Sequence, residues 1–173
     1  SYSYRELLDA AIEDKAKFEK AGITEKSTVV ILGDFSFRSI CSLLACLMVK
    51  STVIPLTKEA HKKLEYQLNV MKPDFLIDTF SDTIRNISGK NKASGRENWR
   101  ALLPISSSGL IVFTSGTTGT PKAVVHSVDA LCYRYISPKP PLNFMCFLKF
   151  DHMGGVNTLL GIFFRGGTAT VPS

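Results

Sequence analysis

Nine consecutive residues, TSGTTGTPK at 114–122, combine the groups that bind polyphosphate. Gly116 and Gly119 allow a tight turn in which successive backbone N–H groups point at one anion. Hydrogen-bond donors, one lysine and no carboxylate predict a loop that holds phosphate groups. A threonine-rich polar turn without a ligand is the alternative interpretation. The side chains that would contribute are Thr114, Ser115, Thr117, Thr118, Thr120 and Lys122, with Pro121 just before the lysine.

The loop differs from the best-known phosphate-binding pattern, G-x-x-x-x-G-K-[ST]. Counted from Gly116, Pro121 stands at the second glycine and Ala123 stands at the hydroxyl residue. Pro121 has no N–H to offer a phosphate, and Ala123 has no hydroxyl to offer Mg²⁺. The chain also lacks the G-x-G-x-x-G pattern of dinucleotide-binding folds. Both of those nucleotide-binding families are therefore disfavoured.

Short apolar runs of strand type alternate with helical segments along the chain, and strand 110–113 leads directly into the loop. This alternation predicts an α/β layered fold with a largely parallel sheet and flanking helices. A polar stretch at about 80–104 predicts a loop between two α/β units. The expected helices cover 4–20, 37–50, 61–72, 129–135 and 156–165, and the expected strands cover 28–33, 52–56, 74–79, 110–113, 123–126, 143–148 and 168–171.

Composition favours one compact domain, because 45% of the residues are hydrophobic and only 21% are charged. The net charge of +6 suits an anionic partner such as a nucleotide. Nucleic acid is not expected, since the basic residues between 85 and 100 have only Trp99 for base stacking. No apolar run is long enough to span a membrane, and residues 1–10 do not form a signal peptide.

Metal-ligand spacing is absent from the histidines and cysteines. Cys41 and Cys46 lie in an apolar helical run and are interpreted as small buried hydrophobic residues. Four cysteines without a disulfide framework favour a reducing compartment, the cytoplasm. The residues concerned are His61, His126, His152, Cys41, Cys46, Cys132 and Cys146.

The loop TSGTTGTPK resembles the phosphate loop of adenylate-forming enzymes, which are AMP-binding acyl-CoA synthetases and adenylation domains that load carrier proteins. SYSYRELL at 1–8 and TVIPL at 52–56 resemble the family's opening helix and the end of its first α/β unit. FDHMGG at 150–155 and FRGGTATVP at 164–172 resemble the segment after the loop. The resemblance covers almost the whole chain. It implies that residues 1–173 form part of a large N-terminal AMP-binding domain, with the remainder of the enzyme absent.

Three positions depart from the family's pattern. Lys50-Ser51 replaces a usual Gly-Ala pair before TVIPL, and Ala123 replaces the glycine that usually follows the loop lysine. Val128 stands where the family often has histidine, so His126 is not the matching residue and has no expected role. The extra methyl of Ala123 is expected to be tolerated, whereas Val128 could alter support of the loop.

Family members join a carboxylic acid to the AMP part of ATP, release pyrophosphate, and pass the acyl group to a thiol of coenzyme A or of a carrier protein's phosphopantetheine arm. The resemblance implies that residues 114–122 bind the ATP phosphates, that Thr117 or Thr118 approaches Mg²⁺, and that Lys122 is catalytic through charge neutralisation. His152 and Gly154 would belong to the substrate pocket, where the imidazole could orient the acid. Alternatively, His152 ends a strand and caps a helix; Asp151 is expected to be a cap at most.

The family's adenine-binding stretch, Mg²⁺-binding glutamate, ribose-binding aspartate and C-terminal catalytic lysine lie downstream and have no counterpart in residues 1–173. The isolated chain is therefore expected to be inactive. Two other hypotheses stay open: a non-catalytic nucleotide- or phosphate-binding module, and an adenylation domain that loads an acyl carrier protein. The sequence does not specify the carboxylic acid or the acceptor thiol.

Overall fold

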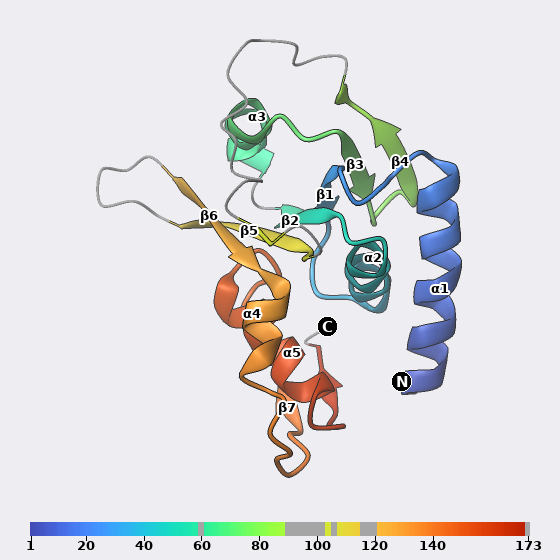
Figure 1. The fold of residues 1–173 in the computed structure, drawn as a ribbon, viewed down its shortest axis with the longest axis vertical. Coiled ribbons are helices and arrows are strands. Elements are labelled where there is room, and N and C mark those ends of the chain that lie inside the picture. The colour runs from blue at the N-terminus through green and yellow to red at the C-terminus, as the bar shows by residue number, and fades with distance from the viewer. Residues whose placement is uncertain (59–60, 89–102, 105–106, 115–120, 172–173) are drawn as a thin grey trace.

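The computed structural model describes residues 1–58, 61–88, 103–104, 107–114 and 121–171 of the chain. Helices and strands alternate along it as expected (Figure 1). The elements are α1 (Tyr4–Lys20), β1 (Thr28–Leu32), α2 (Phe37–Met48), β2 (Thr52–Leu56), α3 (His61–Met71), β3 (Phe75–Asp78), β4 (Thr83–Asn86), β5 (Gly109–Thr114), β6 (Lys122–Ser127), α4 (Val128–Tyr133), β7 (Phe144–Met145), α5 (Met153–Phe163) and β8 (Ala169–Thr170).

The main sheet has six strands in the order β4-β3-β1-β2-β5-β6. Its four inner strands pair in parallel, and the two edge strands, β4 and β6, are antiparallel to their neighbours. A second, two-stranded sheet pairs β7 with β8 in parallel. The predicted α/β fold with a largely parallel sheet is thus confirmed.

Helices cover both faces of the main sheet, which explains why β1 and β2 are buried along their whole length. Val29 and Ile31 of β1 pack toward α1 and α2, whereas Val30 and Leu32 pack toward α3. This alternation follows from the two-residue repeat of a strand. Helices α4 and α5 cover β5 on the α2 side, in a cluster formed by Leu110, Val112, Val128, Leu131, Val156 and Leu160.

Local signals fix the start and end of several helices. Ser3 and Glu6 form the expected capping box at α1. Hydrogen bonds from the backbone and side chain of Ser3 lower the pKa of the Glu6 carboxyl. Gly22, with φ +91°, follows the end of α1 in a conformation that favours glycine. Ser36 and Ser127 cap α2 and α4 through their hydroxyls. These helices therefore begin where the sequence predicts, within a residue.

The predicted loop at about 80–104 is wrong at Thr83–Asn86, which form strand β4. β4 pairs with β3 at the edge of the sheet, and its side chains are mostly exposed. An exposed edge strand needs no apolar alternation, so its sequence carries no strand signal. Residues 89–102 of that stretch lie outside the described residues. The strand expected at 143–148 is confined to Phe144–Met145, and α5 begins at Met153 rather than at Val156.

Candidate functional site

The predicted phosphate loop connects the antiparallel strands β5 and β6. Their register runs from Gly109 opposite Ser127 to Thr114 opposite Lys122, so the first and last residues of the loop motif are brought together. The Thr114 hydroxyl donates a hydrogen bond to the Lys122 carbonyl over 3.4 Å. Both side chains are exposed. The motif residues between them that lie outside the described residues are Ser115, Gly116, Thr117, Thr118, Gly119 and Thr120.

Helix α3 contacts the start of β6. The Tyr66 hydroxyl donates a hydrogen bond to the Pro121 carbonyl over 3.4 Å. A neighbouring residue on α3, Gln67, is buried, and its side-chain oxygen has no hydrogen-bond partner among the described residues. Tyr66 was not a candidate in the sequence, because nothing in an amphipathic helix marks a residue that reaches another strand.

Strand β5 diverges from β2 on the way to the loop. Their pairing comprises Thr52 with Gly109 and Val53 with Leu110 and goes no further. Beyond it lies Pro55, which has no N–H for a neighbouring strand. The Leu56 carbonyl accepts a hydrogen bond from the Gly33 N–H on the β1 side, so Pro55 faces the β5 side. Pro55 therefore removes a ladder bond where β5 diverges from β2.

The second candidate segment, Phe150–Gly155, is attached to the carboxyl ends of the parallel strands. The Asp151 Oδ2 accepts a hydrogen bond of 3.1 Å from the Thr57 hydroxyl, which follows β2 directly. Phe150 makes an edge contact with Phe35, which follows β1, at 5.3 Å between ring centroids. Ligands of open α/β sheets bind at this edge. Thr57 carried a usable signal that sequence reasoning missed: a polar residue directly after a buried parallel strand.

His152 is the residue that caps α5, and it does so without a side-chain hydrogen bond. The expectation that Asp151 caps this helix is wrong, since its carboxylate points to Thr57 instead. The His152 side chain is 63% exposed, and its Nε2 lies 3.9 Å from the Asp151 Oδ1. An exposed imidazole beside a carboxylate can bind or orient an acidic ligand.

Two glycines open helix α5, and they differ in what surrounds them. A Cβ on Gly155 would lie 2.2 Å from the Lys149 carbonyl oxygen, so Gly155 allows a close backbone approach. A Cβ on Gly154 would meet only the end of the Leu148 side chain, at 2.7 Å. Gly155 thus has a packing role, and Gly154, the predicted pocket residue, faces a flexible side chain.

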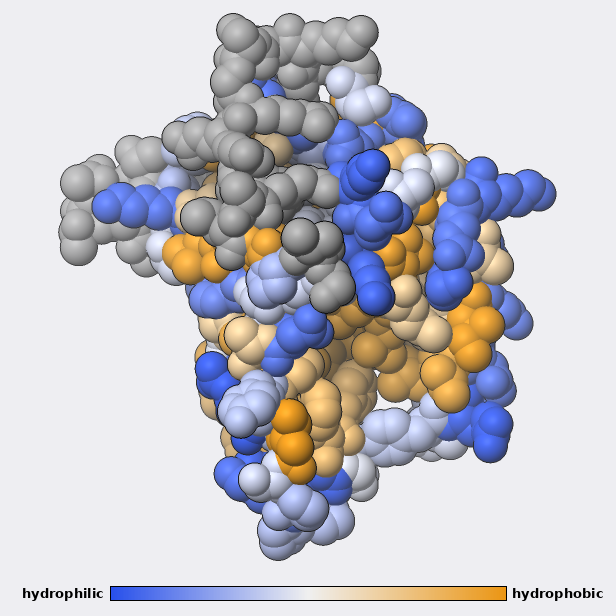
Figure 2. All heavy atoms as spheres, viewed as in Figure 1, coloured by the Kyte–Doolittle hydropathy of each residue, from blue (hydrophilic) through white to orange (hydrophobic). Residues whose placement is uncertain are grey.

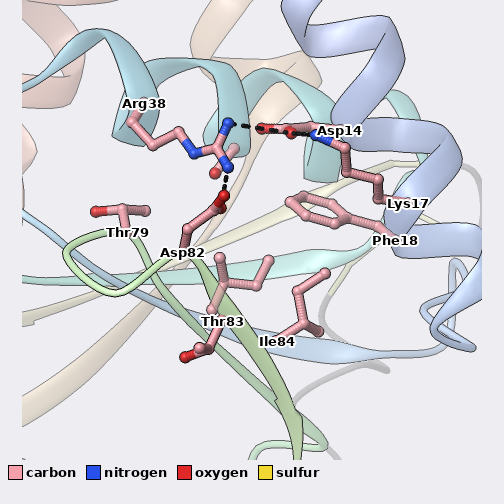
Figure 3. A pocket seen from close by; sticks show the side chains of 10 residues that line it. Asp14, Lys17, Phe18, Arg38, Thr79, Asp82, Thr83 and Ile84 are labelled. Atoms are coloured by element: carbon pink, nitrogen blue, oxygen red, sulfur yellow. Dashed lines mark hydrogen bonds and ion pairs between the residues drawn. The ribbon is translucent and has the colours of Figure 1, made fainter.

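A cavity of about 130 Å³ lies on another part of the molecule, between α1, α2 and the β3–β4 hairpin (Figure 3). Its charged groups neutralise one another: Arg38 contacts both Asp14 and Asp82, and Lys17 contacts Asp14 over 3.3 Å. Arrangements of this kind are structural ion pairs, with no charge left over for a ligand. The cavity is therefore not the candidate site.

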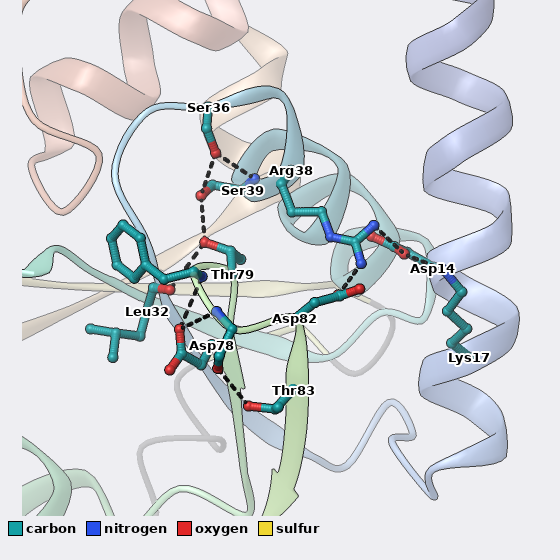
Figure 4. A network of polar contacts seen from close by, with 12 residues as sticks. Asp14, Lys17, Leu32, Ser36, Arg38, Ser39, Asp78, Thr79, Asp82 and Thr83 are labelled. Carbon is teal, nitrogen blue, oxygen red and sulfur yellow. Dashed lines mark hydrogen bonds and ion pairs between the residues drawn. The ribbon is translucent and has the colours of Figure 1, made fainter. Parts of the chain in front are cut away.

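Polar groups at the carboxyl ends of β1 and β3 are also paired internally (Figure 4). The Thr79 hydroxyl donates to the Leu32 carbonyl over 3.1 Å and lies 2.9 Å from the Ser39 hydroxyl. Gly33 permits this approach, since a Cβ there would lie 2.1 Å from the Thr79 hydroxyl. Hydrogen bonds within the protein thus occupy the polar groups at the carboxyl ends of β1 and β3.

Two described residues at the ends of the loop motif carry groups that suit ATP. Exposed Thr114 and Lys122 offer a hydroxyl and a positive charge, which suit the phosphates of ATP. The predicted Mg²⁺ contacts, Thr117 and Thr118, lie outside the described residues. Across the part of the chain that the structure describes, no group of three or more His, Cys, Asp or Glu side chains could hold a metal ion.

Other titratable residues are explained by packing. Cys41 and Cys46 are buried, which confirms them as small core residues. Burial raises the pKa of the Cys46 thiol to about 12 and that of the Cys41 thiol to about 11. Burial and the charge of Arg134 lower the pKa of His126, a residue of β6. Among the described residues, no helix has the length and apolar character needed to cross a bilayer.

Curated relatives include peptide synthetases and a carrier-protein ligase. The chain is 30% identical over 131 residues to bacitracin synthase 1 of Bacillus licheniformis, covering 71% of this chain and 2% of that protein. It is 28% identical over 143 residues to the D-alanine–D-alanyl carrier protein ligase of Streptococcus pneumoniae, covering 75% of this chain and 27% of that protein. The chain thus spans a small part of the length of these relatives.

Solved structures share the fold at low sequence identity. The N-terminal subdomain of Klebsiella oxytoca NpsA, in complex with 3-hydroxyanthranilyl-AMSN, matches 99% of this chain and 46% of its own with a TM-score of 0.75 and 16% identity. The inhibitor-bound N-terminal domain of FACL13 from Mycobacterium tuberculosis matches 98% of this chain and 50% of its own, with a TM-score of 0.75 and 16% identity. The model of the AMP-binding enzyme family matches residues 1–173, and the chain therefore belongs to the AMP-binding, adenylate-forming enzymes.

Proposed function

We propose that the protein containing this chain is an ATP-dependent acid–thiol ligase that forms an acyl-adenylate and then a thioester. The observation that carries the proposal is the family match over residues 1–173, together with a hairpin that brings Thr114 and Lys122 together at the two ends of the phosphate loop. The exposed lysine at one segment suits the phosphates of ATP, and the exposed imidazole at the other suits a carboxylate.

In the proposed first half-reaction, residues 114–122 hold the ATP phosphates. When bound, ATP with Mg²⁺ supplies an activated phosphoryl group and pyrophosphate as the leaving group. Lys122 stabilises the negative charge that accumulates on the phosphates, while the backbone N–H groups and hydroxyls of the loop orient them. Thr117 and Thr118 are the residues proposed to approach Mg²⁺. Pro121 shapes the end of the loop, and Tyr66 supports it through the Pro121 carbonyl.

His152 and Gly154 are proposed to line the pocket for the carboxylic acid. Support comes from the attachment of their segment to the carboxyl ends of β1 and β2 and from the exposure of the imidazole. His152 would donate a hydrogen bond to the carboxylate and hold it for attack on the phosphoryl group. Gly154 would leave room beside it when the flexible Leu148 side chain, its close neighbour among the described residues, turns away.

Residues 1–173 are proposed to be part of a larger N-terminal domain. The chain covers only 46% and 50% of the two neighbouring N-terminal structures. Apolar side chains are exposed around α4, β7 and the end of α5, and apolar residues also gather in the hollow between α1 and the α4–α5 column (Figure 2). Surfaces of that kind mark contacts with further protein. The 173-residue piece alone is accordingly expected to be inactive.

The acceptor is proposed to be a thiol of a carrier protein or of coenzyme A, and the named relatives favour the carrier protein. One of them is a ligase for a D-alanyl carrier protein. The substrates would be a small-molecule carboxylic acid and ATP, with no nucleic acid partner. The described cysteines are free thiols, which suits a reducing compartment and a cytoplasmic location.

The test is carboxylate-dependent ATP–pyrophosphate exchange with a panel of fatty, aromatic and amino acids. The longest open reading frame that contains this sequence is compared with the 173-residue piece. We expect exchange with one class of acid in the long form, none in the short form, and a loss of about 10²–10³-fold in the long form of Lys122→Ala. Lys139→Ala is the matched control, because Lys139 is exposed and remote from the loop motif in sequence.

The second candidate, a non-catalytic nucleotide-binding module, predicts a different outcome. The long form would then bind ATP without exchange for any acid, and Lys122→Ala would weaken binding alone. Offering purified carrier protein and coenzyme A to the exchange-competent enzyme then identifies the acceptor. Exchange that is unaffected by Lys122→Ala would contradict the assigned role of this lysine.

A further inference from the structure

The Asp151 carboxylate joins two parts of the chain that are 94 positions apart. Its Oδ2 accepts the hydrogen bond from the Thr57 hydroxyl, and Thr57 is only 3% exposed. The Asp151 side chain is 19% exposed, and its Oδ1 has no hydrogen-bond partner among the described residues. The Oδ2 atom is thus hydrogen-bonded at the end of β2, and the buried Oδ1 atom faces a neighbouring side chain.

That neighbour is the imidazole of His152. Its Nε2 lies 3.9 Å from the Asp151 Oδ1, a distance within the range of an ion pair and longer than a hydrogen bond. The imidazole is mostly exposed, so a ligand can reach the ring. Because the Thr57 hydroxyl holds the Asp151 carboxylate in place, the imidazole has a fixed neighbour on the side of its Nε2 atom.

The backbone on both sides of Asp151 is also held in place. Phe150 is fully buried and contacts Phe35, the residue that follows β1 by a short turn. After His152, the close approach of Gly155 to the Lys149 carbonyl fixes the first turn of α5. The Thr57 hydrogen bond is therefore the side-chain contact that attaches this segment to the end of β2.

We propose that Asp151 is a positioning residue that, held by Thr57, orients His152 near the carboxyl end of β2. This inference rests on the function proposed above, in which His152 contacts the carboxylic acid. Helix capping does not account for the carboxylate, because α5 starts at His152 without a side-chain cap and Asp151 turns to Thr57. The pair Thr57–Asp151 then acts on the acid subsite and not on the phosphate loop.

The first experiment measures KM for the acid and for ATP in the long form. Thr57→Val keeps the shape and removes the hydroxyl donor, and Thr57→Ser keeps the donor as the matched control. Loss of one hydrogen bond corresponds to about fivefold. We expect Thr57→Val to raise the KM for the acid by about fivefold with the KM for ATP unchanged, and Thr57→Ser to stay near the wild type. Equal changes in both KM values, or the same loss in Thr57→Ser, would overturn the inference.

A double-variant cycle separates positioning from general stability. If Asp151 and Thr57 act through the imidazole, then His152→Ala combined with Thr57→Val loses no more than His152→Ala alone. If the effects of the two substitutions on the KM for the acid multiply instead, Thr57 acts independently of His152, and the proposal is overturned. Asp151→Asn keeps an acceptor for Thr57 but loses the charge facing His152, and it is expected to lose less than Asp151→Ala.

Two further readouts keep this inference separate from the proposed function. If His152→Ala leaves the KM for the acid unchanged, the pocket role of His152 fails. If the long form shows no ATP–pyrophosphate exchange, amide hydrogen exchange tests the contact between Thr57 and Asp151 directly. The amide hydrogens of residues 152–156 should then exchange faster in Thr57→Val and at the wild-type rate in Thr57→Ser. Unchanged exchange in Thr57→Val overturns the attachment, and thermal melting of each variant checks that it folds.

Discussion

The main-sheet region, from α1 to β6, and the C-terminal region, from α4 to β8, differ in how they bury apolar side chains. In the main-sheet region, strands β1 and β2 are covered on both faces and fully buried. In the C-terminal region, β7 is exposed and, among the described strands, pairs only with β8. A two-stranded sheet is marginal by itself. We therefore expect the main-sheet region to contribute most of the free energy of folding, and the C-terminal region to be stabilised by packing against it.

The two regions meet where the candidate site lies. Helices α4 and α5 rest on β5, and the segment before α5 is attached to the ends of β1 and β2. A rigid sheet can thus support residues that a small, exposed region could not hold in position. From this difference we make four predictions, ordered by decreasing effect on the free energy of unfolding.

The largest effect is expected from deleting a core side chain of the main sheet. Ile31→Ala removes a side chain that is 0% exposed, and it should lower the free energy of unfolding by about 2–5 kcal/mol. Met145→Ala in β7, where the side chain is 52% exposed, should cost less than about 0.5 kcal/mol. Urea unfolding followed by circular dichroism measures both, and comparable losses would refute the contrast between the regions.

Next comes the start of α5. Gly155→Ala would place a Cβ against the Lys149 carbonyl oxygen, and the backbone shift should cost about 1–3 kcal/mol. Gly161→Ala, in the same helix, meets Tyr135 at an ordinary 3.5 Å and should stabilise by up to about 1 kcal/mol through helix propensity. Thermal melting of the two variants distinguishes close backbone packing from propensity; matching shifts would argue against the packing role of Gly155.

A smaller loss is expected from the ion pairs that join α1, α2 and the β3–β4 hairpin. Arg38→Met removes one partner of the largely buried Asp14, which keeps its contact with Lys17, so the cost should be about 1–2 kcal/mol. Lys15→Met breaks the exposed pair with Glu19 and should cost less than about 0.5 kcal/mol. Urea midpoints at low and high salt test this, and a larger loss for Lys15→Met would contradict it.

The smallest effect concerns His126 of β6. Burial and Arg134 lower its pKa from the usual 6.5, so the unfolded chain binds the proton more readily than the folded one. Stability should therefore fall as the pH drops below 6.5, and His126→Gln should flatten that part of the profile. Unfolding measured across this pH range provides the check, and an unchanged slope in His126→Gln would remove His126 as the cause.

Much of the fold could be predicted because its signals are local. Capping residues such as Ser3 and Ser127 act on amides within a few positions, and buried strands such as Thr28–Leu32 are continuous apolar runs. β4 was missed because an exposed edge strand has no apolar pattern, and its pairing with β3 supplies the order instead. The phosphate loop motif and the position of His152 were also readable from the sequence.

The amino-acid sequence by itself determined the alternation of helices and strands, the family and the two segments that carry candidate chemistry. Only the tertiary structure decided that Pro55 lies where β5 diverges from β2, that Tyr66 reaches the Pro121 carbonyl, and that Asp151 turns to Thr57 rather than to α5. The physical reason is distance along the chain. A hydrogen bond across 94 positions depends on where the sheet places each partner, and no local pattern of residues encodes that placement.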